Sequence, residues 1–232
     1  KLLLELFSPF GGNEATMRGK LVHALAPELW NAAPDHNHTA AADSLLNKSV
    51  YEAVVLSAVP ATIKAQADPH VRSLRKWFAL DLFDEKKPVM RSETFLLEPR
   101  LGLKGRIDAV WERDTEVVAI GEFKTSKSWG REANHGHQLQ ILAYTLMLVV
   151  KKGLQIVNGP AAWIVYTGNE LLGGAANNVG RQIPVSWPSL KRAVWVRNEL
   201  VKVELTGHAH APDNPNKCKN CKQDAECAEL RQ

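Results

Sequence analysis

The chain has 232 residues and a net charge of +4, with a hydrophobic fraction of 45% and a charged fraction of 23%. These values are those of an ordinary globular protein with one substantial core, and they exclude a disordered or collagen-like chain. No stretch approaches the roughly 20 apolar residues that a membrane span needs, so no membrane partner is expected. The mild positive charge is compatible with a polyanionic partner but does not require one.

The N-terminal part of the chain is predicted to be mainly helical. Asn13 can cap a helix over residues 14–26, which Pro27 is expected to end. Two further helices are expected over residues 44–60 and 61–83. Basic side chains on the last of these helices are compatible with contact to a nucleic acid backbone, although a solvated helix face is the simpler account.

A region rich in β-forming residues follows the helices. Residues 89–97 are expected to form a strand. Residues 105–111 and 117–124 are two apolar runs on either side of the polar segment 112–116, a pattern typical of an antiparallel hairpin.

The predicted hairpin places charged side chains next to each other. With the turn centred on Thr115, Asp108 falls opposite Glu122, and opposite residues of an antiparallel pair project to the same face. The period of two puts Lys124 on the face of Glu122 and sends Phe123 into the core. Neighbouring carboxylates repel each other unless a cation lies between them, so the pair predicts a site for a hard divalent ion such as Mg²⁺. The alternative is a solvated hairpin, because so short a motif also arises by chance.

The hairpin is followed by an apolar helix, expected over residues 133–151 and buried against a sheet. Gln140 and Tyr144 are four residues apart and share one face of it, either as the polar border of a core helix or as hydrogen-bond donors to a phosphate. Two strands and a final helix are expected over residues 161–167, 182–186 and 188–205. This order of elements predicts an α/β protein with a central mixed sheet flanked by helices.

Three cysteines lie close together near the end of the chain, at Cys218, Cys221 and Cys227. An odd and tight cluster is a poor disulfide framework and a good soft-metal site, so a reducing cytoplasmic location is expected. The spacing alone does not choose between an iron–sulfur cluster, zinc and three free thiols.

Five motifs occur along the chain: a GxxxHxxL-like helix at residues 19–26, GxxD at 105–108, ExK at 122–124, QxxxY at 140–144 and CxxCx5C at 218–227. In this order they resemble the RecB-like nucleases of the PD-(D/E)XK superfamily. The cysteine spacing is similar to that of the iron–sulfur branch, which includes CRISPR-associated RecB-like exonucleases, AddB-type nucleases and related phage exonucleases. Residues from about 43 to 87 match no motif, and Ala26 stands where the first motif has leucine.

The resemblance implies a restriction-endonuclease-like fold in a single nuclease domain over residues 1–232. Within it we expect a mainly helical segment over residues 1–88, the nuclease core over 89–187, and a C-terminal helix with the metal-cluster region over 188–232.

The resemblance also implies the roles of the site residues. The implied ligands of Mg²⁺ or Mn²⁺ are His23, Asp108, Glu122 and the backbone carbonyl of Phe123. Lys124 is implied as the catalytic lysine beside Asp108 and Glu122. Gln140 and Tyr144 would position the substrate phosphate or support the lysine. A metal-bound water of lowered pKa would attack the phosphodiester, and an imidazole ligand favours Mn²⁺ more than an all-oxygen site would.

In the family that the chain resembles, four cysteines hold a [4Fe–4S] cluster, and the first of them precedes the GxxxHxxL helix. This chain has no cysteine before Cys218, so the fourth ligand is expected near or before Lys1. The alternatives are a labile three-cysteine cluster, an emptied cluster site, three free thiols, or zinc held with His208 or His210.

These features together predict a metal-dependent DNA exonuclease that acts on single-stranded or frayed ends. A structure-specific endonuclease of the same superfamily is the first alternative, because fold and site do not set the polarity of cleavage. The second is a non-catalytic DNA-binding adaptor that assists a helicase, an integrase or a recombination factor. The sequence does not choose among the pathways of CRISPR adaptation and of phage or cellular recombination and repair.

Overall fold

The structure is a computed structural model that describes residues 14–31, 61–80, 82–83, 87–126, 132–154, 160–172 and 179–207. The chain divides into two compact units, Lys1–Lys191 and Arg192–Gln232. The first unit contains the sheet and the predicted site residues of the hairpin. The predicted helix over residues 44–60 and the three cysteines lie outside the described residues.

The described helices are α2 (Glu14–Asn31), α5 (Ala61–Phe78), α6 (His135–Lys152) and α7 (Trp187–Thr206). The strands are β1 (Val89–Glu98), β2 (Leu103–Arg113), β3 (Glu116–Lys124), β4 (Ala161–Tyr166) and β5 (Gly180–Ile183). Short 3₁₀ turns follow β1 and β4, at η1 (Pro99–Leu101) and η2 (Thr167–Leu172).

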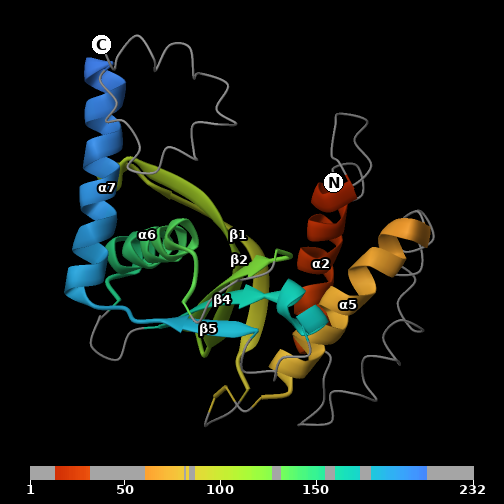
Figure 1. Cartoon of the computed structure of the whole chain (residues 1–232). Coiled ribbons are helices and arrows are strands. Elements are labelled where there is room, and N and C mark those ends of the chain that lie inside the picture. The colour runs from red at the N-terminus through yellow and green to blue at the C-terminus, as the bar shows by residue number, and fades with distance from the viewer. Residues whose placement is uncertain are drawn as a thin grey trace. The chain divides into compact units, whose positions relative to one another are not determined.

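The strands form one five-stranded sheet in the order β1-β2-β3-β4-β5. Neighbouring strands are antiparallel except β3 and β4, which run parallel. Parallel neighbours need a crossover connection, and α6 lies in that connection (Figure 1). The predicted mixed sheet flanked by helices, in a restriction-endonuclease-like α/β fold, is therefore confirmed.

Helices cover both faces of the sheet in the first unit (Figure 1). Phe123, which is 1% exposed, packs into a core cluster with residues of α2 and α5 such as Trp30 and Trp77. Its neighbours Glu122 and Lys124 contact Gln140 of α6 instead. Because successive side chains of a strand point to opposite faces, α2 and α5 cover one face and α6 covers the other.

Helix α2 does not end at Pro27, as predicted, but continues to Asn31. A proline inside a helix costs about 3 kcal/mol. The extra turn buries Trp30, whose ring packs edge-on against Trp111 and whose Nε1 donates a hydrogen bond of 2.8 Å to the Pro88 carbonyl. Truncating a buried tryptophan typically costs about 3–5 kcal/mol, so tertiary packing outweighs the proline.

Two other elements end earlier than predicted. Helix α5 ends at Phe78 rather than at residue 83, because Leu80 N–H donates to the Trp77 carbonyl and tightens the last turn into 3₁₀ geometry. Strand β5 ends at Ile183 rather than at residue 186, because Pro184 has no N–H to continue the ladder.

Candidate active site

The turn between β2 and β3 is shorter than predicted. Only Asp114 and Thr115 lie outside the strands, with φ values of 48° and 80°. Positive φ at both positions is typical of a two-residue hairpin turn. This turn pairs Glu112 with Val117, which is one residue away from the predicted register.

A bulge in β3 restores the predicted register before the site is reached. Between the pairs Glu112↔Val117 and Trp111↔Ala119, β3 contributes one extra residue, Val118. The pairing then runs to Ala109↔Gly121, so the next two residues, Asp108 and Glu122, are neighbours across the strands. The predicted register is therefore correct at this point, although a bulge produces it and not the turn. The two side chains then take different partners, His23 for Asp108 and Lys124 for Glu122.

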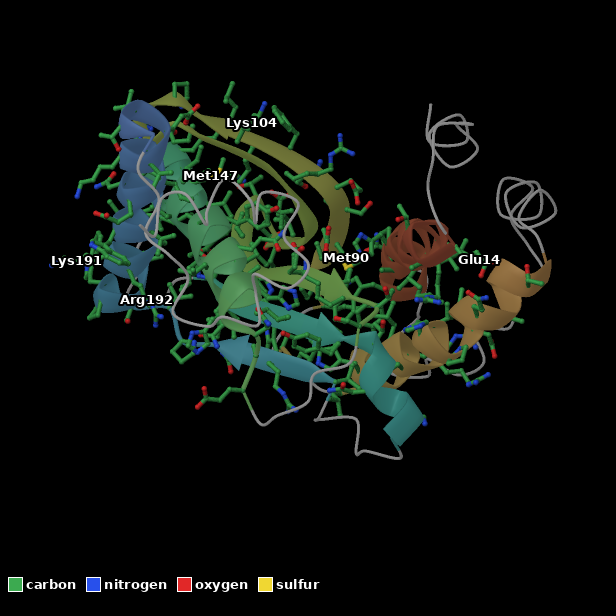
Figure 2. The ribbon with its side chains drawn as sticks, turned by 45° about the horizontal axis from the view of Figure 1, so that its top comes forward. Glu14, Met90, Lys104, Met147, Lys191 and Arg192 are labelled. Carbon is green, nitrogen blue, oxygen red and sulfur yellow. The ribbon has the colours of Figure 1, made fainter. Side chains whose placement is uncertain are left out.

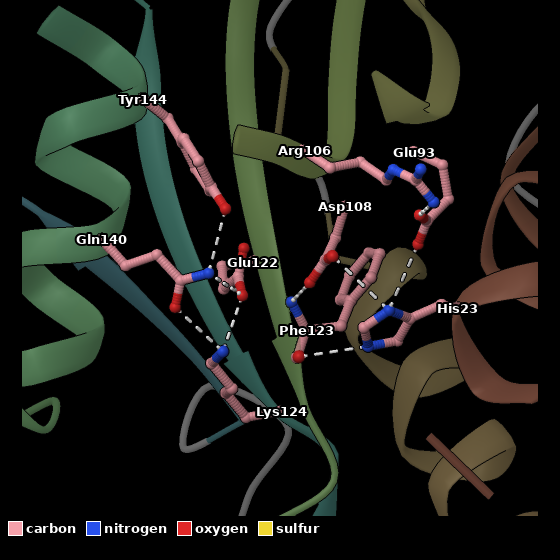
Figure 3. Close-up of polar contacts among 9 residues, drawn as sticks. All are labelled: His23, Glu93, Arg106, Asp108, Glu122, Phe123, Lys124, Gln140 and Tyr144. Carbon is pink, nitrogen blue, oxygen red and sulfur yellow. Dashed lines mark hydrogen bonds and ion pairs between the residues drawn. The ribbon is translucent and has the colours of Figure 1, made fainter. Parts of the chain in front are cut away.

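The strands β2 and β3 separate beyond this point. The Phe123 N–H, which faces β2, donates a 2.8 Å hydrogen bond to Asp108 Oδ2 instead of to a backbone carbonyl. The Phe123 carbonyl lies 3.2 Å from His23 Nε2. Where the pairing ends, Figure 3 shows His23 of α2 beside Asp108 and the Phe123 carbonyl, and Gln140 of α6 beside Glu122 and Lys124. We call this place, where β2 and β3 no longer pair, the gap.

On the α2 side of the gap, His23, Glu93 and Asp108 form a group that could hold a metal ion. His23 Nδ1 lies 3.4 Å from Asp108 Oδ1 and 3.6 Å from Glu93 Oε1. One ligand atom from each of the three residues lies within 4.8 Å of the others. The group joins two predicted ligands to one that the sequence analysis missed.

Glu93 is the missed residue, and its backbone is unusual. It lies in the middle of β1 with φ of 53°, a left-handed conformation that is rare outside glycine. The paired residues on either side of it, Ser92↔Ala109 and Thr94↔Ile107, place it opposite Asp108. The sequence carried one signal for it, because Glu93 is the single acidic residue in the β-rich run 89–97.

On the α6 side of the gap, Lys124 is held by two partners. Its Nζ donates to Glu122 Oε1 at 2.6 Å and to Gln140 Oε1 at 3.1 Å. Gln140 Nε2 in turn donates to Glu122 Oε1 at 2.6 Å and to the Tyr144 hydroxyl at 3.1 Å. The structure thus brings the lysine, the glutamate and the predicted QxxxY pair together in one network (Figure 3).

Glu122 is buried with incomplete compensation for its charge. The residue is 3% exposed, and within the described part of the chain its Oε2 has no hydrogen-bond partner. Burial, assisted by the charge of Asp108, raises the pKa of Glu122 to about 7, although Lys124 opposes the shift. An unpartnered buried carboxylate oxygen is costly. It fits a divalent cation, which would supply the missing partner.

Asp108 and His23 also titrate away from their ordinary values. Burial raises the pKa of Asp108, against the opposing charge of His23. Burial by itself would lower the pKa of His23, but hydrogen bonding to Glu93 and the charge of Asp108 outweigh burial and raise that pKa. Burial is the largest cause for the two acids, Asp108 and Glu122, whereas the pKa of His23 is raised by its carboxylate neighbours. A bound cation would stabilise the ionised form of these buried acids.

A buried polar chain supports the backbone of Lys124 from the α5 side, and the sequence analysis did not anticipate it. The Thr167 hydroxyl donates to the Lys124 carbonyl at 3.2 Å, and His70 Nδ1 lies 3.0 Å from the same hydroxyl oxygen. Since the hydroxyl has one proton, which it donates to the carbonyl, the His70 ring is the donor to Thr167.

Comparison with known protein families finds a match to one family model. The family model for the PD-(D/E)XK nuclease superfamily matches residues 4–228. The chain belongs to the PD-(D/E)XK nuclease superfamily, whose nucleases use divalent metal ions. A search of curated proteins finds no match. Among the described residues, no helix is long and apolar enough to cross a membrane.

Proposed function

We propose that this protein is a Mg²⁺- or Mn²⁺-dependent DNA exonuclease that hydrolyses phosphodiester bonds at single-stranded or frayed ends. The observation that carries the proposal is that a cluster of ligand atoms and a held lysine lie beside the same segment of β3, where its pairing with β2 ends. Superfamily membership supports the nuclease activity.

The metal ligands in this proposal are His23, Glu93, Asp108 and Glu122, with the Phe123 carbonyl. A bound Mg²⁺ or Mn²⁺ supplies a water of lowered pKa and polarises the phosphate. The imidazole of His23 favours Mn²⁺ among these two ions.

Lys124 stabilises the negative charge that develops on the phosphate or orients the attacking water. Its ammonium group has three N–H donors, of which Glu122 and Gln140 accept two, so within the described residues one remains for the substrate. Because both partners fix the position of Nζ before substrate arrives, the lysine acts without reorganisation. Tyr144 accepts a hydrogen bond from Gln140, which leaves its own O–H to donate to a substrate phosphate.

Three cysteines complete the proposal. Cys218, Cys221 and Cys227 bind an iron–sulfur cluster of the [4Fe–4S] type, supported by their spacing and by the order of the other motifs. This assignment favours the iron–sulfur branch and a cytoplasmic location, and it is compatible with CRISPR adaptation and with recombination and repair.

The alternatives differ in substrate geometry and in catalysis. A structure-specific endonuclease would use the same residues on an internal bond. A non-catalytic adaptor, which would serve a helicase, an integrase or a recombination factor, has less support because Asp108, Glu122 and Lys124 are all present.

The test is degradation of end-labelled single-stranded DNA in Mg²⁺ or Mn²⁺, with Lys124→Ala beside the wild type. The variant should lose roughly 10²–10³-fold in rate, the usual effect of removing one charge-stabilising donor. Lys151→Ala, an exposed lysine at the end of α6, is the matched control and should keep full activity.

The outcomes separate the three functions. Equal activity of wild type and Lys124→Ala would remove Lys124 from catalysis. A covalently closed single-stranded circle should resist an exonuclease, and its cleavage would favour the endonuclease. Tight DNA binding by an inactive wild type would favour the adaptor.

A further inference from the structure

The outer part of the β1–β2 hairpin exposes basic and apolar side chains next to each other. Phe95 lies opposite Arg106, and Leu97 lies opposite Lys104, so each pair projects to one face. Phe95 is 60% exposed and Leu97 is 50% exposed, whereas Leu96 between them is buried. We call Phe95, Leu97, Lys104 and Arg106 the hairpin surface, and Figure 2 shows Lys104 on the outer side of the hairpin.

The hairpin surface is continuous with the metal-binding group. Arg106 Nη1 lies 3.1 Å from Glu93 Oε2, and Glu93 belongs to that group with His23 and Asp108. The register places Glu93 opposite Asp108, one step of two residues before the pair of Phe95 and Arg106. A ligand bound on the hairpin surface therefore extends directly to the predicted metal.

We infer that the hairpin surface is a binding track for a single-stranded nucleic acid. One base stacks on the Phe95 ring, the apolar Leu97 side chain contacts the neighbouring base, and the phosphates bind Lys104 and Arg106. The inference rests on the proposed function and names the residues that hold the single strand beside the same site.

The chemistry of the hairpin surface selects a single strand over a duplex. Aromatic rings interleaved with basic side chains are the usual means of binding a single strand without sequence preference, because every base has a face that can stack. In a duplex the bases are already stacked on each other, and only the phosphates could contact this surface. Arg106 Nη1 donates to Glu93 Oε2, which holds its guanidinium at the end of the hairpin surface nearest the metal-binding group.

The test measures binding of a fluorescein-labelled oligothymidylate by anisotropy, with Ca²⁺ in place of Mg²⁺ to suppress cleavage. Phe95→Ala should bind about 5- to 150-fold more weakly, the range that loss of one stacked base represents. Phe95→Tyr retains an aromatic ring and should bind like the wild type. Trp195→Ala removes a ring of similar exposure, 62%, from α7 and should change nothing.

Lys104→Ala gives a second and independent measurement. A plot of the logarithm of affinity against the logarithm of salt concentration should become shallower by about 0.7, the slope of one phosphate contact to a single strand. Lys151→Ala should leave the slope unchanged. Circular dichroism verifies that each variant is folded.

Unchanged affinity in both Phe95→Ala and Lys104→Ala would overturn the inference. An equal loss of affinity by Phe95→Ala for a blunt duplex would overturn the assignment to single strands. Hydrolysis of bis(p-nitrophenyl) phosphate needs the metal-binding group and Lys124 but not the hairpin surface, so Phe95→Ala should retain it. A wild type that cleaves neither this diester nor DNA contradicts the proposed function, and the anisotropy result still decides the inference.

Discussion

Glu93 and Asp108 lie opposite each other in the register of β1 and β2, and His23 from α2 is within 3.6 Å of both carboxylates. A bound cation explains this grouping of two acids and an imidazole better than packing does. Glu93 also holds a left-handed backbone conformation in mid-strand, and strain of this kind persists where a site requires it.

Glu93→Gln should therefore weaken the binding of Mn²⁺ by roughly tenfold or more, because an amide oxygen replaces a charged ligand. Isothermal titration calorimetry with Mn²⁺ alone measures the change. Glu116→Gln, at the exposed start of β3, is the matched control. Equal affinities in Glu93→Gln and wild type would remove Glu93 from the ligand set.

The burial of Glu122 predicts how stability depends on pH in the metal-free protein. Its pKa rises from the ordinary value of 4.5 to about 7, so the folded state holds the proton more tightly than the unfolded state. The contribution to stability is full below about pH 4.5 and is lost as the pH rises through about 7, by up to about 3 kcal/mol. Asp108 and His23, whose pKa values are also raised, act in the same direction.

Thermal melts of the wild type and Glu122→Gln in EDTA, between pH 5 and pH 8, test this expectation. The variant carries no titrating group at this position and does not lose this contribution. The difference in melting temperature, variant minus wild type, should therefore increase as the pH rises. A difference that does not vary with pH would contradict the raised pKa. Added Mn²⁺ should stabilise the wild type more at pH 8 than at pH 5, because protons compete with the ion.

Gln140 joins Lys124, Glu122 and Tyr144, so its removal should leave the fold intact and disturb the lysine. We expect Gln140→Ala to lower kcat by roughly 10–100-fold, with KM changed much less. Gln182→Ala, exposed on β5, should behave like the wild type. A loss confined to KM would make Gln140 a substrate-binding residue and not a support of Lys124.

Two glycines of the motifs should respond oppositely to substitution. A Cβ at Gly105 would lie 2.4 Å from Tyr144 Cε1, so Gly105→Ala should lower the free energy of unfolding by about 1–3 kcal/mol. A Cβ at Gly19 meets nothing within 4 Å among the described residues, so Gly19→Ala should raise it by about 1 kcal/mol through helix propensity. Urea denaturation of both variants measures the two changes, and equal effects would contradict the packing of Tyr144.

Protein purified without oxygen should be brown and should contain iron, as judged by elemental analysis. The spacing of Cys218, Cys221 and Cys227 motivates this expectation. Stoichiometric zinc without iron would refute the iron–sulfur assignment, and Cys218→Ser should lose the colour while the nuclease core stays folded.

The local pattern of the sequence was sufficient to predict much of the fold and of the site. Alternation along residues 105–124 predicted the β2–β3 hairpin, the burial of Phe123 and the neighbouring positions of Asp108, Glu122 and Lys124. These residues lie within one hairpin, where a period of two determines which side chains share a face. The spacing of Gln140 and Tyr144 on α6 was readable for the same reason, with a helical period.

Contacts between distant segments decided the rest. Helix α2 passes Pro27 because Trp30 is buried against strands far along the chain. Glu93 joins the site because β1 pairs with β2 in one register, and the bulge at Val118 aligns Asp108 with Glu122. Register and burial depend on the summed packing of elements that are remote in sequence, whereas a local pattern specifies only the face on which each side chain lies.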